Sequence, residues 1–163
     1  MEKNIGIYIC SGCDIAESID LESLTNTVQT EFNPKICKLN GAWCSKKCTT
    51  EIQSDIEKES LDSIVIAACS LRYKNKEFDF GKDIITERIN LRELVSWCSE
   101  PNAEDTQMLA EDYLRMGITK INGMELPEGY KPDTFNRRIL VIGGGISGIS
   151  AALDAARIRD EIE

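Results

Sequence analysis

Three short stretches of the chain have the apolar character of strands buried inside a sheet. Ile5–Cys10 is apolar at nearly every position, and Ser63–Cys69 is β-branched, uninterrupted and bounded by polar residues. Strands that are covered on both faces show this continuous pattern. Pro34–Leu39 is a shorter run of the same kind, and a turn signal at Asn40 and Gly41 ends it. We therefore predict three strands in the first half of the chain.

Three further stretches repeat apolar residues every three or four positions, which is the spacing of a helix with one packing face. Asp20 and Asn102 lie at the start of the first and the third stretch and are expected to cap them. In the third stretch, Leu109, Tyr113 and Met116 are expected to share the packing face. The predicted helices are Leu21–Phe32, Thr49–Ser60 and Asn102–Ile118.

Strands that alternate with helices predict an α/β fold, here a three-layer, Rossmann-like domain built on a parallel sheet. Its strands Ile5–Cys10 and Ser63–Cys69 are expected to be adjacent and parallel, and Ile84–Val95 fits either a strand or a helix. The composition then changes, because Asn122–Pro132 holds two glycines and two prolines and is typical of a linker. We predict a cysteine-rich domain over residues 1–121, a linker over 122–137 and the start of a second domain over 138–163.

A glycine-rich turn follows the apolar run Arg138–Ile142, which we predict to be a new buried strand. Gly143 is expected to form the tight turn, Gly145 to let the backbone approach a pyrophosphate, and Gly148 to let helix and strand pack closely. The helix that follows would direct its N-terminus at the phosphate charge. A complete site also needs a second strand that ends in a ribose-binding acid. No second strand precedes Glu163, so this residue is not expected to be that acid. We therefore expect this chain alone to hold a dinucleotide weakly or not at all.

Net charge and the length of the apolar segments argue against some binding partners and against a place in the membrane. The chain has 19 basic and 28 acidic residues and a net charge of −9, which disfavours nucleic acid and anionic membrane surfaces as partners. Its apolar runs are too short for a membrane span, and its start does not resemble a signal peptide. We therefore expect a cytoplasmic protein whose thiols stay reduced.

Seven cysteines and the lack of histidine point to thiolate chemistry. Soft all-thiolate sites select iron–sulfur clusters or zinc. Cys10 and Cys69 end predicted strands, Cys13 completes a C-x-x-C motif with Cys10, and Cys44 lies just beyond the second strand. Because the carboxyl ends of parallel strands share one edge, these four cysteines are expected to converge and to ligate a metal centre.

The other cysteines have less distinctive positions. Cys37, in the middle of a predicted strand, fits a core residue and a ligand equally well, whereas Cys48 and Cys98 fit core packing better than ligation. A thioredoxin-like redox pair is the competing interpretation of Cys10 and Cys13. That motif should open a helix directly, and here several residues separate it from the first predicted helix.

Taken together, these stretches resemble the N-terminal region of the heterodisulfide reductase A subunits and their homologues, the flavin-containing iron–sulfur subunits of electron-transfer complexes. The resemblance extends over essentially the whole chain and rests on the combination of motifs. The matching stretches are 5–13, 65–70, 87–93, 112–117 and 138–152.

The resemblance implies an N-terminal domain with one [4Fe-4S] cluster, followed by an FAD domain similar to thioredoxin reductase. Cys10, Cys44 and Cys69 fall on cysteines of the family. Many members carry a further cysteine where this chain has Val95, and many begin with Cys-x-Cys where this chain has Cys-x-x-Cys. The fourth ligand is therefore open among Cys13, Cys37, Cys48 and Cys98.

The resemblance also implies a function, namely an iron–sulfur electron-transfer module of a flavoprotein oxidoreductase. It would relay electrons between FAD and partner subunits of the heterodisulfide reductase B or C, hydrogenase or ferredoxin type, and the isolated chain is not expected to be catalytic. The alternative from another class is a zinc-stabilised structural or docking module without a redox role.

Overall fold

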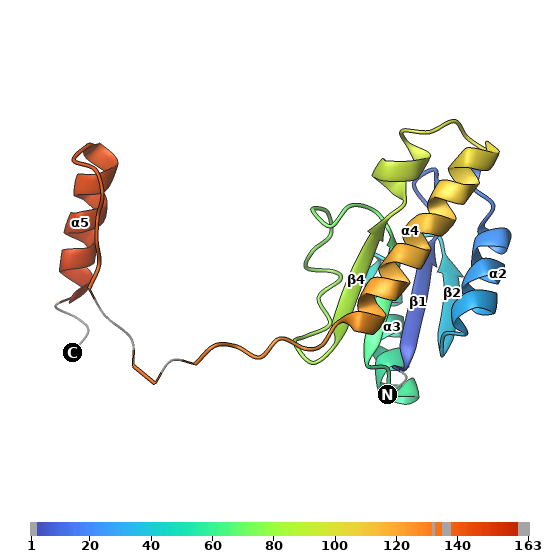
Figure 1. Ribbon diagram of the computed structural model, residues 1–163, viewed down its shortest axis with the longest axis horizontal. Coiled ribbons are helices and arrows are strands. Elements are labelled where there is room, and N and C mark those ends of the chain that lie inside the picture. The colour runs from blue at the N-terminus through green and yellow to red at the C-terminus, as the bar shows by residue number, and fades with distance from the viewer. Residues whose placement is uncertain (1–2, 132, 135–137, 160–163) are drawn as a thin grey trace. The chain divides into compact units, whose positions relative to one another are not determined.

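The computed structural model describes residues 3–131, 133–134 and 138–159. The chain divides into two compact units, Met1–Pro127 and Glu128–Glu163. In the first unit, four parallel strands form one sheet in the order β2-β1-β3-β4 (Figure 1). The strands are β1 (Ile5–Cys10), β2 (Ile36–Asn40), β3 (Ser63–Ala68) and β4 (Ile85–Asn90).

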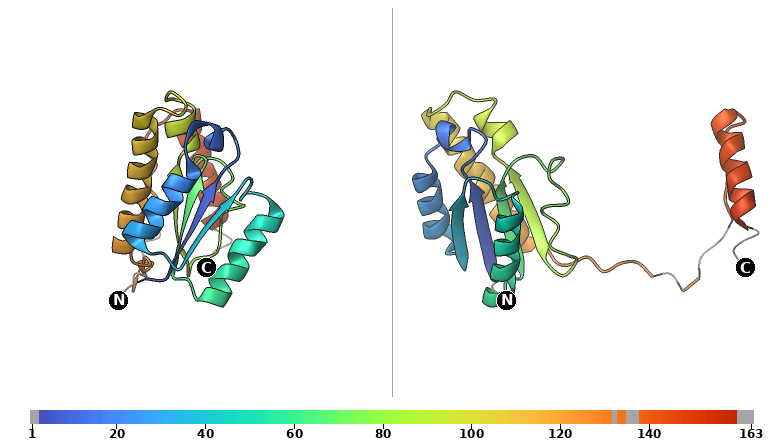
Figure 2. Two further views of the ribbon diagram at one scale, coloured as in Figure 1. Left: turned by 90° about the vertical axis from the view of Figure 1, so that its right-hand side faces the viewer. Right: turned by 180° about the vertical axis from the view of Figure 1, so that it is seen from behind.

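Helices cover both faces of this sheet, so the predicted three-layer α/β fold is confirmed (Figure 2). The helices α2 and α4 pack against each other on one face, and α3 lies on the other. The helices of this unit are α1 (Ile15–Ser18), α2 (Leu21–Phe32), α3 (Lys46–Glu59), the π-helical turn η1 (Arg92–Ser96) and α4 (Glu104–Gly123).

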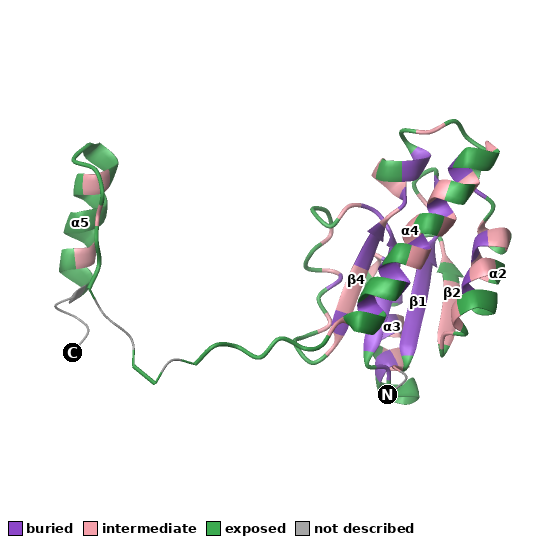
Figure 3. Cartoon of the chain, viewed as in Figure 1, coloured by how far each residue is buried: buried purple, intermediate pink, exposed green. Residues whose placement is uncertain are grey.

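The central strands form the core of the domain. Every residue of β1 and β3 is buried, as the continuous apolar runs predicted (Figure 3). The two strands are adjacent and parallel, with Ile7 beside Val65. The ambiguous stretch Ile84–Val95 combines both alternatives, because it forms β4 and then the π-helical turn η1.

The helix caps were predicted with mixed success. The carboxylate of Asp20 accepts hydrogen bonds from the backbone N–H groups of Glu22 and Ser23, so it caps α2 as expected. Asn102 does not cap α4, which begins later than predicted, at Glu104 after Ala103. Its side chain instead donates to the carbonyl of Glu17 from a left-handed backbone conformation.

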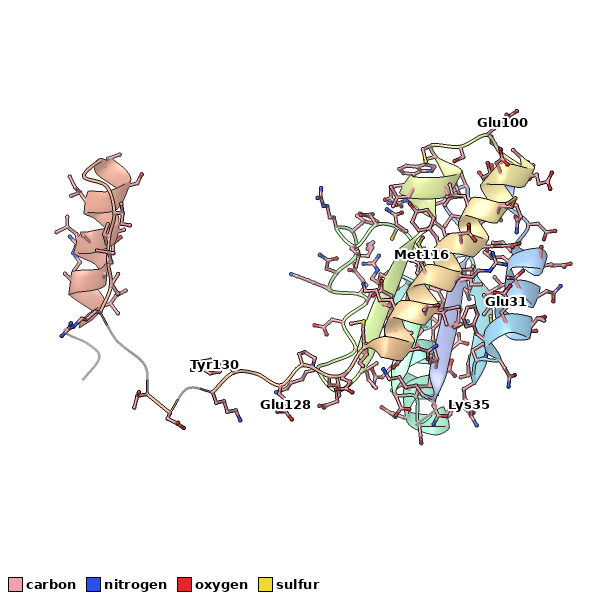
Figure 4. The ribbon with its side chains drawn as sticks, viewed as in Figure 1. Glu31, Lys35, Glu100, Met116, Glu128 and Tyr130 are labelled. Atoms are coloured by element: carbon pink, nitrogen blue, oxygen red, sulfur yellow. The ribbon has the colours of Figure 1, made fainter. Side chains whose placement is uncertain are left out.

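The packing face of α4 also differs from the prediction. Met116 is exposed and points away from the sheet (Figure 4), while Ala110, Leu114 and Ile118 are buried. The helix approaches β4 through Gly117, where a Cβ atom would overlap the side chain of Ile89. The prediction is therefore correct in part: Leu109 and Tyr113 are half-buried against the core, whereas Met116 is exposed, and the fully buried face lies one position further along the helix.

The second unit contains α5 (Ile146–Arg159). The preceding apolar run, predicted as the strand Arg138–Ile142, is not a strand in the described residues, and Ile139, Leu140 and Ile142 are exposed. A parallel strand forms only beside a hydrogen-bonded neighbour. The described part of this unit contains no strand with which the apolar run could pair. Across the described residues of both units, no helix combines the length and the apolar character that a membrane span requires.

Candidate functional site

The carboxyl edge of the sheet carries the four cysteines predicted to bind a metal centre. Cys10 is the last residue of β1, and Cys69 directly follows β3, its parallel neighbour. Cys13 lies in the turn from β1 to α1, and Cys44 lies in the loop from β2 to α3. The strand order reverses between β1 and β3, and open α/β sheets bind their ligands in the crevice at such a switch point.

The turn that holds Cys10 and Cys13 packs directly against the loop that holds Cys44. The backbone N–H of Ser11 donates to the Asn40 carbonyl at 2.9 Å. Gly12 lies so close to Gly41 that a Cβ atom would overlap the Gly41 carbonyl oxygen. The Cys10 Sγ atom lies 3.7 Å from that same oxygen. These backbone contacts place the two cysteine-bearing loops side by side.

Trp43 anchors the loop that carries Cys44. Its side chain is fully buried, and its indole N–H donates to the carbonyl of Ile9 at 2.8 Å. The ring meets Tyr8 edge to face, with 5.0 Å between the ring centroids. Because Ile9 precedes Cys10 and Trp43 precedes Cys44, this one side chain fixes the two cysteine positions relative to each other.

Replacing Trp43 with phenylalanine is therefore expected to destabilise the metal-free protein by about 1–3 kcal/mol, because the Ile9 carbonyl loses a buried hydrogen-bond donor. Trp97 offers a matched control, since it is exposed, and its replacement with phenylalanine should change stability by less than about 0.5 kcal/mol. Urea denaturation of both variants measures the difference. Equal effects would show that Trp43 has no anchoring role.

The Cys10 thiol interacts electrostatically with two other cysteines. Burial raises the pKa of the Cys10 thiol, while hydrogen bonds from the backbone of Gly12 and Trp43 act in the opposite direction. The charges of Cys13 and Cys44 raise the pKa of Cys10 further. Cys10 thus lies within electrostatic reach of two other potential thiolate ligands.

Two arginines border the fourth cysteine. Burial raises the pKa of the Cys69 thiol, and the charges of Arg88 and Arg92 oppose this shift. The Arg88 Nη2 atom lies 3.2 Å from Cys69 Sγ. The ion pair with Glu93 raises the pKa of Arg92, and interactions with Cys13 and Cys69 act in the same direction. Arg92 thus lies near both Cys69 and Cys13.

Sequence reasoning missed these arginines and Trp43. A charged residue inside the strand pattern Ile85–Asn90 was the available signal for Arg88, because such a residue is buried only when its surroundings bind it. Glu93 joins the group by accepting a hydrogen bond from the backbone N–H of Ser70 at 2.8 Å.

The remaining cysteines lie elsewhere. Cys37 pairs with Ile7 near the start of β2, roughly 10 Å along the strands from the end of β1. Cys48 is buried on the core side of α3, as expected. Cys98 is exposed, so the expectation of core packing is wrong. The neighbouring Trp97 lies at the surface over Arg92 instead of entering the core, and it carries Cys98 outward.

The position of Cys37 predicts a pH dependence. Burial raises its pKa from 9.0 to about 11. The unfolded chain thus loses this proton at lower pH than the folded chain. The free energy of unfolding is therefore unaffected by the ionisation of Cys37 below about pH 9 and falls as the pH rises towards 11. The expected loss is about 2–3 kcal/mol.

Unfolding free energies of the metal-free protein at about pH 8 and about pH 11 test this expectation. The Cys37→Ala variant should lose less stability over this range than the wild type, while Cys98→Ala, which removes an exposed thiol, should behave as the wild type does. An identical pH dependence in Cys37→Ala and in the wild type would contradict it.

The donor chemistry at the carboxyl edge fits a thiolate-ligated centre. The four cysteines lie at the carboxyl ends of β1 and β3 and in the loops that follow β1 and β2, and the guanidinium groups of Arg88 and Arg92 border Cys69. Within the described ranges, no three Cys, Asp or Glu side chains are grouped tightly enough to hold a single metal ion. The four cysteines thus lie near one another in the fold, but they do not form a ready-made ligand set for one metal ion.

The glycine-rich turn of the second unit has the backbone features expected of a phosphate-binding turn. Gly143 has a φ of +112°, which a residue with a side chain rarely adopts. A Cβ atom at Gly148 would overlap the Gly143 carbonyl oxygen, so this glycine permits the close approach of α5 to the turn. The space beside Gly145 is open, and α5 begins at the next residue. The residues present therefore fit a pyrophosphate at the start of α5.

No protein-family profile matches the chain. It is similar to curated proteins over almost its whole length. The iron–sulfur A subunit of a CoB–CoM heterodisulfide reductase from Methanopyrus kandleri is 35% identical over 99% of this chain and 26% of the relative. The A subunit of the H2:CoB–CoM heterodisulfide, ferredoxin reductase from Methanothermobacter marburgensis is 35% identical over 95% of this chain and 24% of the relative.

The A subunit of the ferredoxin/F420H2-dependent CoB–CoM heterodisulfide reductase from Methanosarcina acetivorans is 33% identical over 93% of this chain and 20% of the relative. The chain thus spans about a quarter or less of the length of these relatives.

Proposed function

Because this chain is a homologue of the heterodisulfide reductase A subunits over almost its whole length, we propose that it is an iron–sulfur electron-transfer module. Its first unit holds one [4Fe-4S] cluster and relays electrons between a flavin and partner subunits. The observation that supports the proposal is the position of Cys10, Cys13, Cys44 and Cys69 at the carboxyl ends of two adjacent strands and in the loops that follow the strands. When bound, such a cluster accepts and releases single electrons.

The residues of the chain have distinct roles in this proposal. The thiolates of the four cysteines hold the cluster, and Cys13 is the best-placed fourth ligand, because Cys37 is remote from the edge and Cys48 faces the core. Trp43 holds the Cys44 loop against β1. Arg88 and Arg92 supply positive charge beside Cys69, which favours the anionic thiolate that ligation requires.

In the second unit, Gly143, Gly145 and Gly148 form part of a binding site for the pyrophosphate of FAD. The relatives are named as subunits of larger reductases. We accordingly propose that the chain acts with other subunits of an electron-transfer complex, and we expect it in the cytoplasm, where thiols stay reduced.

Anaerobic reconstitution with ferrous iron and sulfide, followed by titration with dithionite, tests the redox role. The visible absorbance of the reconstituted protein is expected to bleach on addition of one electron equivalent and to recover on reoxidation. Protein that binds iron but shows no reversible bleaching would contradict an electron-transfer role, and tight binding of zinc alone would favour a structural module.

A further inference from the structure

Arg88 on β4 is a buried cation with an unusual set of partners. Its residue surface is 7% exposed, and a guanidinium group keeps its proton under all ordinary conditions. Within hydrogen-bond distance it meets the Tyr73 carbonyl at 2.7 Å, the Ser70 carbonyl at 3.1 Å and the Cys69 carbonyl at 3.2 Å. Among the described side chains, its hydrogen-bond partner is the Cys69 Sγ atom, also at 3.2 Å.

These contacts fix the guanidinium group in one orientation. The Phe78 ring lies against its face, with 4.5 Å between the guanidinium carbon and the ring centroid. The Nε atom is buried and has no hydrogen-bond partner in the described structure. Burying a charge is costly unless it is paired or hydrogen-bonded. The groups that hold the Arg88 charge include the sulfur of Cys69.

The second arginine of the site is arranged differently. Arg92 forms an ion pair with Glu93 at 2.6 Å and stacks on the rings of Tyr73 and Trp97. Its charge is therefore largely compensated by a carboxylate, whereas the ion pairs of the described residues include none with Arg88. The positive field at the Cys69 sulfur comes mainly from Arg88.

We propose that Arg88 is a positioning residue that sets the reduction potential of the cluster through its hydrogen bond to the Cys69 sulfur. This inference rests on the proposed function. A reduced cluster carries one more negative charge than an oxidised one, so a fixed cation and a hydrogen bond at a ligand sulfur favour reduction. Arg88 thus makes the cluster a better electron acceptor.

The test compares the full chain with Arg88→Gln, Arg88→Lys and Arg92→Gln variants, all loaded anaerobically with iron and sulfide. Potentiometric titration followed by electron paramagnetic resonance measures the potential. Arg88→Gln is expected to reduce the equilibrium constant for one-electron reduction by about tenfold, which is a fall of about 59 mV. Arg88→Lys, which keeps the charge, should restore most of this loss, and Arg92→Gln should change the constant by less than about threefold, because its charge is paired.

Each outcome bears on the inference. A loaded Arg88→Gln variant with the wild-type potential overturns it, as does an equal shift in Arg92→Gln. Iron and sulfide contents of the wild type are measured in parallel, so a wild type that binds no cluster refutes the proposed function itself, separately from the role of Arg88.

A second measurement covers the case in which Arg88→Gln does not load. Wild-type protein labelled with 15N-arginine is expected to show a hyperfine coupling between the reduced cluster and a guanidinium nitrogen, and this coupling should persist in Arg92→Lys. A loaded wild type without the coupling, or a coupling that disappears in Arg92→Lys, overturns the proposal.

Discussion

Replacing Cys69 with alanine is expected to reduce cluster loading by at least about tenfold. A missing thiolate leaves one iron open to water, and ligand losses exceed the roughly 10- to 100-fold effects of changes around the ligands. Cys69 follows β3 at the edge shared with Cys10 and contacts Arg88 through its sulfur. The same loss is expected for Cys10→Ala and Cys44→Ala, whose positions the backbone of neighbouring loops fixes.

Iron and sulfide analysis after anaerobic reconstitution measures this effect. Cys37→Ala and Cys98→Ala are matched controls, since Cys37 lies near the start of β2 and Cys98 is exposed, and both should load as the wild type does. Full iron content in the Cys10, Cys44 and Cys69 variants would refute the assignment of the site. Loss of loading in Cys98→Ala but not in Cys13→Ala would keep the cluster and change only the fourth ligand.

Replacing Gly12 with alanine is expected to disrupt the site without removing a ligand. The added Cβ atom would overlap the Gly41 carbonyl oxygen. Because this oxygen is a backbone atom, no side-chain rotation can relieve the overlap. The turn with Cys10 and Cys13 must then separate from the loop with Cys44. Overpacking of this kind costs about 1–3 kcal/mol of stability, and we expect cluster loading to fall by about tenfold, as it does when the surroundings of metal ligands are altered.

Gly41 provides the matched control on the opposite side of the same contact. A Cβ atom at Gly41 would lie 3.8 Å from the Ser11 hydroxyl, which is ordinary van der Waals contact. Gly41→Ala should therefore keep both stability and loading, as judged by urea denaturation and iron content. If Gly12→Ala behaves like Gly41→Ala, the close approach of the two loops does not hold the site together.

The central strands β1 and β3, and the edge of the sheet on which Cys10 and Cys69 lie, were predictable from the sequence because both follow from local pattern and topology. Continuous apolar runs indicated β1 and β3, and parallel strands place their carboxyl ends together. Cys10 and Cys69 could thus be assigned to one edge. The capping role of Asp20 was equally local, since it depends on residues two and three positions away.

The errors arose where distant contacts decide the local structure. Asn102 donates to Glu17, which is remote in sequence, and this bond replaces the expected cap of α4. Gly117 brings α4 onto Ile89, so the buried face includes this glycine in place of the predicted Met116. The apolar run before Gly143 is strand-like in composition, yet strand structure depends on a neighbouring strand.

The arginines show a further limit of sequence reasoning. Arg88 carries no motif of its own, and its function can be inferred only once β4 places it beside Cys69. The same holds for Trp43, whose indole N–H reaches back to β1. A pattern of cysteines identifies the candidate metal ligands. The residues that orient these ligands or supply positive charge beside them can be identified only from the three-dimensional structure.

The metal content of the protein purified without oxygen tests the central claim most directly. The proposed function predicts a brown protein with iron and acid-labile sulfide in equal amounts and a broad visible absorbance that dithionite bleaches. A colourless protein that contains stoichiometric zinc and no sulfide would contradict it, and would assign the four cysteines of the carboxyl edge to a structural site.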